Sequence, residues 1–357
     1  MRKLLLFLLI SLASSDQNVP TSLSSCIKVP LNYPYLFSQI QNIEAIPVQV
    51  TAPPPTNSPI NHMSSVAQKI AKNMSKLPHA KIVPRRSSSR GHADHGWLNS
   101  YHTFSFASYY DPAFESFGSL RVLNEDRVAP QNGFPTHSHR DAEIFSYILS
   151  GELTHRDSMV KSADGTSTNK NDFYRMHRGD VQFTTGGTGI AHSEQNEHKT
   201  QEVHFLQIWA LPWTKRLPPT YHTMTFPDAA KLNTFNTIIS PLKAGPKATP
   251  EEEKAAVPTV EGTIPIHADM MMGAGIIQAG KSANWKIGGD STVKSKLGRH
   301  VYVHVPMCKT GAKIQLGGQA VLEEGDGAFV SEVNAGDELL IESIGNGQAE
   351  VVVLDSN

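Results

Sequence analysis

The sequence predicts an all-β fold made of two units of similar size. From residue 80 onward, short runs of β-branched and aromatic residues are interrupted by glycine, proline and asparagine at close spacing. Many short strands separated by such turn signals are typical of a β-sandwich or barrel. Glycine-aspartate precedes an apolar run at three places and favours a turn into a strand there, namely at Gly179-Asp180, Gly325-Asp326 and Gly336-Asp337.

The N-terminal region differs in composition from the rest. Residues 1–15 follow the layout of a secretory signal, with a basic start, an apolar run too short to span a bilayer, and small residues after it. Later starting points at Met63 and Met74 leave open whether these residues belong to the mature protein, so its location stays open between secreted and cytoplasmic or nuclear. Residues 16–79 are rich in proline and serine, and we expect a disordered linker there.

The remaining chain divides into two β units and a connection. The apolar pattern over residues 80–230 predicts the first unit, with strands near 120–123, 143–149, 180–184 and 202–209. Residues 231–262 hold four prolines around a charged run and predict an inter-domain linker. Residues 263–357 return to the strand pattern and predict the second unit, with strands near 271–278, 301–305, 313–316, 327–330, 338–343 and 349–354.

Charge and cysteine content argue against several classes of function. The chain has 32 lysines and arginines against 33 aspartates and glutamates, which gives no reason to expect a broad nucleic-acid or membrane surface. Its two cysteines, Cys26 and Cys308, are too few and too far apart for a disulfide framework or a thiolate metal site. No phosphate-binding loop, dinucleotide fingerprint or nucleophile-elbow motif is present in the required strand–helix setting.

Two short histidine clusters carry the chemistry. In a strand, residues i and i+2 point to the same face, so His137 pairs with His139, and His192 pairs with Glu194. Two such pairs on neighbouring strands would offer three imidazoles and one carboxylate to a single point. This set suits a divalent transition metal (Fe, Mn, Co, Ni, Cu or Zn) and leaves positions for water or substrate.

Glu143 competes with Glu194 for the carboxylate position. It lies four residues after His139 and shares that face if the strand is regular. We expect Glu194 to be the ligand and Glu143 to be an acceptor behind the ligands or a catalytic base. A buried ion pair with Arg140 explains Glu143 equally well.

Other histidines and aromatic residues are expected to have mainly structural roles. A lone histidine is more often a hydrogen-bonded structural residue than a ligand, which applies to His92, His95, His102, His155, His177 and His198. The second unit contains neither a His-x-His nor a His-x-Glu pair, so we expect it to be free of metal. Four aromatic residues of the first unit could line a substrate pocket or belong to the barrel core, namely Phe134, Phe145, Phe183 and Trp209.

The sequence resembles the pirin family, and within it the quercetinase-like branch. The resemblance rests on the run from Arg90 to Leu98, the Thr-Phe-Ser-Phe run at 103–106, the His-x-His-Arg cluster, and the turn before His192-Ser193-Glu194. It is strong over residues 80–225, weaker through the second half, and absent from residues 1–75. The acidic Asp141 after the cluster favours the quercetinase-like branch, although it departs from the usual pirin pattern.

This resemblance implies a bicupin, in which two cupin-type β-barrels (jelly rolls) face each other and the N-terminal one holds a single metal. The family's ligands fall on His137, His139, His192 and Glu194. Fe(II) is the metal that the resemblance favours, with Cu, Ni, Co, Mn or Zn as alternatives. The implied activity is that of a quercetin 2,3-dioxygenase (flavonol 2,4-dioxygenase), with Glu143 or Glu194 taking the proton of the substrate hydroxyl.

The family also implies an alternative, a non-catalytic redox-sensing iron protein that partners transcription regulators. For the enzyme we expect a small aromatic substrate such as a flavonol. For either function we expect a monomer with no direct nucleic-acid contact and no membrane segment in the mature form.

Overall fold

The computed structural model describes residues 77–159, 173–289 and 298–357. These residues belong to one compact unit, Ile60–Asn357. The signal expected at 1–15 and nearly all of the linker expected at 16–79 lie outside the described residues. Within the described ranges, no helix has the length and apolar character needed to cross a bilayer.

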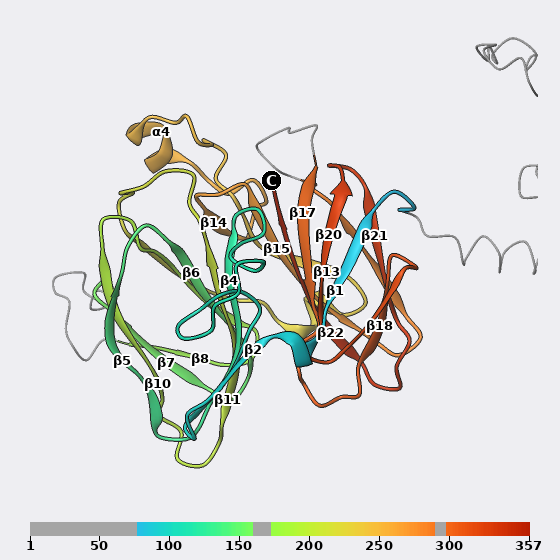
Figure 1. Cartoon of the computed structure of the whole chain (residues 1–357). Helices are drawn as coiled ribbons and strands as arrows, with labels where there is room; N and C mark the ends of the chain where they lie inside the picture. Colours follow the sequence, from blue (N-terminus) through green and yellow to red (C-terminus); the bar gives the residue numbers. More distant parts are fainter. Residues whose placement is uncertain (1–76, 160–172, 290–297) are drawn as a thin grey trace, which may run out of the picture. The chain divides into compact units, whose positions relative to one another are not determined.

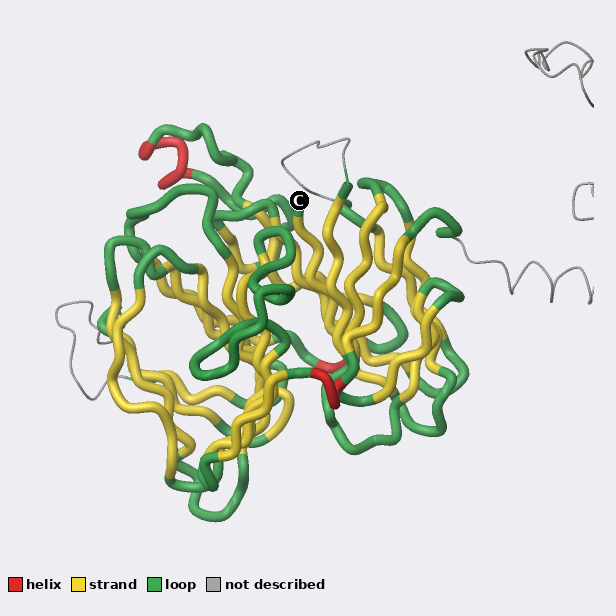
Figure 2. The backbone as a smooth tube through the Cα atoms, viewed as in Figure 1, coloured by secondary structure: helices red, strands yellow, loops and turns green. Residues whose placement is uncertain are grey.

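The first barrel consists of a seven-stranded and a four-stranded antiparallel sheet (Figures 1 and 2). The seven-stranded sheet has the order β12 (Thr220–Thr225), β9 (Asp180–Thr185), β6 (Glu143–Ser150), β11 (Val203–Ala210), β4 (Leu120–Val128), β3 (Leu98–His102), β2 (Gly91–Asp94). The four-stranded sheet has the order β5 (Asn132–His139), β10 (Ile190–Asn196), β7 (Leu153–Asp157), β8 (Tyr174–Met176). The all-β prediction for this unit is confirmed.

The second barrel repeats this seven-plus-four arrangement. Its seven-stranded sheet has the order β1 (Lys81–Arg85), β20 (Gly327–Val333), β17 (Arg299–His304), β22 (Ala349–Ser356), β15 (Met270–Ile277), β13 (Phe235–Pro241), β14 (Ile264–Ile266). Its four-stranded sheet has the order β16 (Ser282–Lys286), β21 (Glu338–Ser343), β18 (Lys313–Leu316), β19 (Ala320–Glu323). The described helices are short, namely η1 (Ser87–Ser89), α3 (Asp228–Lys231) and α4 (Pro250–Ala255).

The domain boundaries differ from those expected at two places. Strand β1 pairs with β20 of the second barrel, although residues 80–230 were assigned to the first unit. Strand β13 pairs with β15 and β14, so seven residues of the expected linker 231–262 form a strand of the second barrel. In both cases the strand satisfies backbone groups at or near the edge of the second barrel's large sheet, a tertiary requirement that local composition does not reveal.

The apolar faces of the two seven-stranded sheets form one core between the barrels. In β6, Phe145, Tyr147 and Leu149 point into this core and meet side chains of the second barrel such as Met272 and Tyr302. A second cluster of aliphatic residues fills the interior of the second barrel. Among the described residues, the apolar cluster inside the first barrel has seven buried members, fewer than the cluster inside the second barrel, so this interior has room for polar side chains.

A buried ionic cluster also joins the barrels. Glu125 of β4 accepts hydrogen bonds from Arg90 (3.1 Å), His204 (2.8 Å) and His304 of the second barrel (3.0 Å). Burial alone raises the pKa of Glu125. The hydrogen bonds from both histidines and the charge of Arg90 outweigh it and hold the pKa well below its usual range. Glu125 is therefore an ionised carboxylate whose buried partners come from both barrels.

Candidate metal centre and cavity

The two histidine clusters lie on neighbouring strands of the four-stranded sheet. Strand β10 runs antiparallel to β5, with His192 directly opposite His137. The imidazole nitrogens of His137, His139 and His192 lie within 4.8 Å of one another. The structure thus brings together the three imidazoles that were expected to converge if the two pairs lay on neighbouring strands.

The nitrogen atoms of these imidazoles are arranged as a metal requires. His137 Nδ1 lies 2.8 Å from the carbonyl oxygen of Pro135 and donates to it, which leaves the lone pair on Nε2. That Nε2 lies 3.1 Å from His192 Nε2. His139 Nε2 is buried and has no hydrogen-bond partner among the described residues. Three converging Nε2 atoms of this kind fit a divalent transition metal.

Burial keeps His139 and His192 in the form that binds metal. Desolvation, with the nearby His137, lowers the pKa of His139 to about 4. Desolvation and the surrounding imidazoles lower the pKa of His192 to about 2. Both rings are therefore neutral at neutral pH, so protons do not compete with a metal for their lone pairs.

Glu194 faces the same interior but is not part of the histidine group. Its Oε1 accepts from Ser146 Oγ at 3.0 Å, and its Oε2 lies 3.4 Å from Gln207 Nε2. The pairing of β10 with β5 shifts register between His192 and Glu194. Burial raises the pKa of Glu194 to about 7, against the hydrogen bonds from Ser146 and Gln207. The expected fourth ligand is thus close to the histidines, with both carboxylate oxygens held by neighbours.

Glu143 points away from the histidines. Strand β5 ends at His139, Asp141 has φ +51°, and β6 begins at Glu143, so the regular strand assumed for the parity argument is broken here. Along β6, Glu143 shares its face with Phe145, which packs between the barrels. Its carboxylate contacts Thr185 Oγ1 (3.2 Å) and His267 of the second barrel (3.4 Å). The role expected for it as a base beside the metal has no support in this placement.

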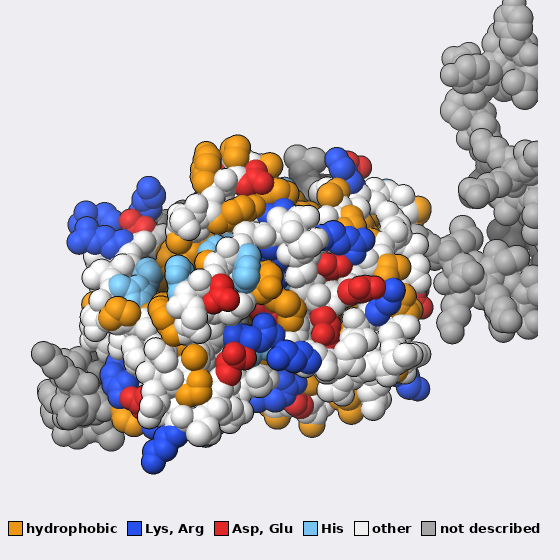
Figure 3. All heavy atoms as spheres, turned by 60° about the horizontal axis from the view of Figure 1, so that its bottom comes forward, with side chains coloured by type: hydrophobic (Ala, Val, Ile, Leu, Met, Phe, Trp, Pro, Cys, Tyr) orange, Lys and Arg blue, Asp and Glu red, His pale blue; other side chains and the backbone are white. Residues whose placement is uncertain are grey.

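A cavity of about 390 Å³ opens beside the histidine group. Of the four aromatic wall candidates, Phe134 and Trp209 line it. Phe145 and Phe183 instead stack on each other at 5.7 Å in the core between the barrels. The other lining residues are Ala93, His95, Leu98, Ser100, His102, Phe106, Ala107, Ser108, Asn124, Asp126, Pro135, His137, His139, Glu194 and Gln207. On the first barrel's side of Figure 3, histidine side chains gather next to hydrophobic ones.

Sequence reasoning missed Asp126 as a residue of this cavity. Asp126 is 4% exposed, and its carboxylate accepts a hydrogen bond from Ser100. Burial raises the pKa of Asp126 to about 7 despite that hydrogen bond, and the negative charge of Glu194 adds to the rise. The signal was present in the run Asn124-Glu125-Asp126. Such a polar run inside an apolar strand needs polar partners on both faces.

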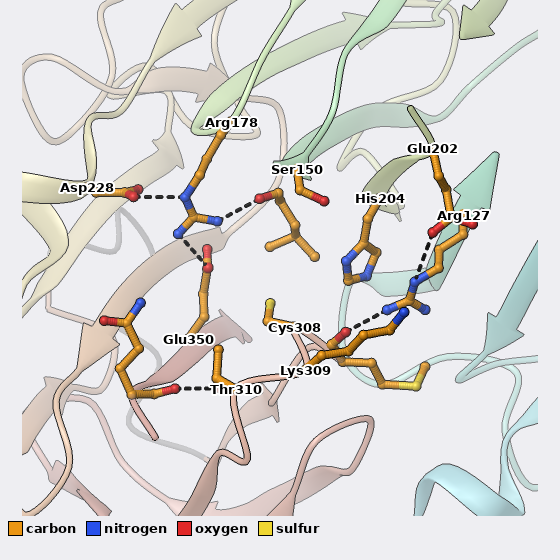
Figure 4. A pocket seen from close by; sticks show the side chains of 13 residues that line it. Arg127, Ser150, Arg178, Glu202, His204, Asp228, Cys308, Lys309, Thr310 and Glu350 are labelled. Atoms are coloured by element: carbon orange, nitrogen blue, oxygen red, sulfur yellow. Dashed lines mark hydrogen bonds and ion pairs between the residues drawn. The ribbon is translucent and has the colours of Figure 1, made fainter. Parts of the chain in front are cut away.

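A second cavity, of about 360 Å³, lies where the two barrels meet (Figure 4). Its two arginines are already paired with carboxylates. Arg178 binds Asp228 and Glu350 at 2.8 Å each, and Arg127 lies 3.6 Å from Glu202. Burial, together with the charge of Glu350, raises the pKa of the Cys308 thiol, so this sulfur stays protonated and unreactive. We therefore place the functional site in the cavity beside the histidines.

The fold and the histidine group define a two-barrel protein of the cupin type with a site that could hold a metal ion. The family model described as Pirin matches residues 83–210. The solved structure of the bacterial pirin YhhW from Escherichia coli, in complex with nickel(II), is similar with a TM-score of 0.60 and 29% identity, over 77% of this chain and 99% of that chain. The chain belongs to the pirin family, as its sequence motifs predict.

Two curated relatives are similar over part of the chain. "Quercetin 2,3-dioxygenase" of Escherichia coli strain K12 is 44% identical over 145 residues, which cover 41% of this chain and 58% of that protein. A "Pirin-like protein" of Caulobacter vibrioides is 35% identical over 201 residues, which cover 56% of this chain and 75% of that protein. This chain therefore spans little more than half of the Escherichia coli relative's length in the alignment.

Proposed function

We propose that this protein is a metal-dependent dioxygenase that opens the ring of a flavonol such as quercetin with dioxygen. The proposal rests on the convergence of three imidazoles, of which His137 and His139 line the 390 Å³ cavity. A concave, largely apolar cavity with a few polar groups suits a small aromatic molecule. The name of the Escherichia coli relative points to the same substrate class.

We infer that the metal is held by His137, His139 and His192, with Glu194 as the anionic fourth ligand. Fe(II) is our first choice. Ni, Cu, Co, Mn and Zn suit the same donors, and the nickel complex of the related bacterial pirin agrees with a permissive site. When bound, such a metal would act as a Lewis acid toward a substrate oxygen, and a redox-active metal could also exchange electrons with dioxygen.

The chain's own residues hold the substrate and take its proton. Trp209 meets Phe106 edge-on at 5.5 Å between ring centroids and meets His139 at 4.9 Å, so aromatic walls stand directly beside the ligands. These walls exclude water and favour a flat ring. Since Glu194 is used as a ligand, we assign the acceptor of the substrate hydroxyl proton to Asp126, in place of the expected Glu143 or Glu194.

Aerobic incubation with quercetin tests the activity. We expect protein loaded with Fe(II) or Ni(II) to consume flavonol absorbance and to release carbon monoxide in step with it. Free metal at the same concentration is the control. The proposal fails if protein that carries about one metal ion per chain leaves quercetin unchanged with every metal named above.

Replacing Asp126 by asparagine should lower turnover by about 10²–10⁴-fold, the usual contribution of a positioned proton acceptor. Asparagine keeps the shape and the hydrogen bond from Ser100 but cannot take a proton. Steady-state kinetics and metal content should be measured together, and metal content should not change.

The matched control for this variant is Glu143→Gln, which removes the other candidate base. Its side chain contacts the second barrel and does not line the cavity, so its turnover should stay near that of the parent. The opposite pattern, a slow Glu143→Gln and a normal Asp126→Asn, would return the role of base to Glu143.

A further inference from the structure

A second buried histidine lies directly behind His192. Strand β7 is the neighbour of β10 on the side away from β5. From it, His155 places its Nε2 3.0 Å from His192 Nδ1, with the two rings nearly perpendicular at 88°. His155 is fully buried, and its own Nδ1 lies 3.4 Å from the hydroxyl oxygen of Tyr221 on β12. These contacts form a continuous chain from Tyr221 through His155 to His192.

The direction of this chain determines whether His192 can bind a metal. A neutral imidazole has one N–H group and one lone pair. If the lone pair of His192 is on Nε2, the atom that faces His137, its proton is on Nδ1 and is donated to His155 Nε2. His155 then carries its own proton on Nδ1 and donates it to the Tyr221 oxygen. In the opposite direction, His192 Nε2 carries the proton and has no lone pair for a metal.

We propose that His155 and Tyr221 are positioning residues, which hold His192 in the Nδ1–H tautomer and in the ring orientation that a metal on Nε2 requires. The inference rests on the metal site proposed above and deepens it. Each ring keeps one proton, so the arrangement needs no net gain or loss of protons. Ligand histidines depend on such acceptors for their tautomer and orientation, and losing one typically lowers metal affinity by about 10–100-fold.

The surroundings favour a hydrogen bond over a second metal ion at this point. The donor atoms of His155, Asp157 and His192 also lie within 4.8 Å of one another. However, Asp157 is 3.8 Å from His192 Nδ1 and already accepts from the backbone N–H of Met159 and from Thr184. A metal on both nitrogens of His192 would remove the only proton of that ring, whereas 3.0 Å is an ordinary N–H···N distance.

The test is Co(II) binding to the full chain, followed by chelator competition and by proton NMR of the exchangeable ring N–H signals shifted by the metal. We expect His155→Phe to bind Co(II) about 10–100-fold more weakly and to lose the slowly exchanging N–H signal of His192. In His155→Gln, the amide oxygen accepts from Nδ1–H and should restore part of the affinity. Tyr221→Phe should weaken binding less than His155→Phe, because only the outer hydrogen bond is lost.

The matched control is His222→Phe, next to Tyr221 on β12. His222 contacts Phe183 on the opposite face of the strand, so Co(II) affinity and the N–H signals should not change. Thermal melts and circular dichroism of each variant separate a lost fold from a lost ligand. If His155→Phe does not fold, two other results test the positioning role. A slowly exchanging His192 N–H in the parent and weaker Co(II) binding by Tyr221→Phe would support it, and the absence of both would overturn it.

Three outcomes separate the possible failures. Parent-like affinity and N–H signals in a folded His155→Phe would overturn the positioning role while leaving the metal site intact. Two Co(II) ions per chain, one of them lost in His155→Phe, would assign His155 to a second metal site instead. Equal Co(II) binding by the parent and by His192→Ala would overturn the metal site itself.

Discussion

Replacing His192 by alanine is expected to reduce bound metal from about one ion per chain to almost none and to abolish any dioxygenase activity. The substitution removes one of three converging nitrogens and also separates His155 from the site. The two remaining imidazoles, His137 and His139, sit on β5 alone, without the donor that faces them from β10. Metal content should be measured by elemental analysis after chelation and reloading with Fe(II) or Ni(II).

A matched control is His177→Ala, which removes a histidine whose side chain is 62% exposed and whose carboxylate partners are Glu152 and Asp180. Metal content and thermal stability should stay close to those of the parent. If His192→Ala retained the full metal content while His177→Ala lost it, the ion would be bound elsewhere and the proposed centre would be refuted.

Replacing Glu125 by glutamine is expected to lower the free energy of unfolding by about 3–5 kcal/mol, the usual cost of breaking a buried ion pair from one side. The change leaves the Arg90 guanidinium, whose side chain is 0% exposed, without its counter-charge. It also weakens the hydrogen bond from His204 and the one from His304, which joins the two barrels. Urea unfolding followed by tryptophan fluorescence measures the loss.

The pH dependence of this effect follows from the lowered pKa of Glu125. A depressed carboxylate pKa contributes stability above the pKa of the unfolded chain, and this contribution is lost as the pH falls through the pKa of the folded protein. The difference in the free energy of unfolding between the parent and Glu125→Gln should therefore be largest near neutral pH and become smaller in acid.

Glu202→Gln is the matched control for Glu125→Gln. It alters an ion pair in which the Glu202 carboxylate lies 3.6 Å from Arg127, and the Glu202 side chain is 51% exposed. An exposed pair of this kind contributes about 0–1 kcal/mol. If both variants lost the same free energy of unfolding, Glu125 would not act as an ionised link between the barrels. A difference between the parent and Glu125→Gln that grew in acid would show the same.

The all-β class, the two units and the pirin family could be predicted from the sequence, because they depend on local periodicity and short motifs. Strand alternation also placed His137 with His139, and His192 with Glu194, since two residues in a regular strand share a face whatever the strand packs against. The two pairs were expected on neighbouring strands, and β5 and β10 do pair with each other. For these features, sequence spacing and structure agree.

The contacts around the three histidines could not be predicted from spacing along the chain. Glu143 faces the second barrel because the turn at Asp141 ends one strand before another begins. His155 comes to lie behind His192 because β7 and β10 are neighbours in the sheet, 37 residues apart in sequence at this contact. Strand β1 crosses to the second barrel to pair with β20. Which residues share a strand face could be predicted from local spacing, because it depends on neighbouring backbone dihedrals. Which strands pair, and what lies behind each face, depends on long-range packing that spacing along the chain does not encode.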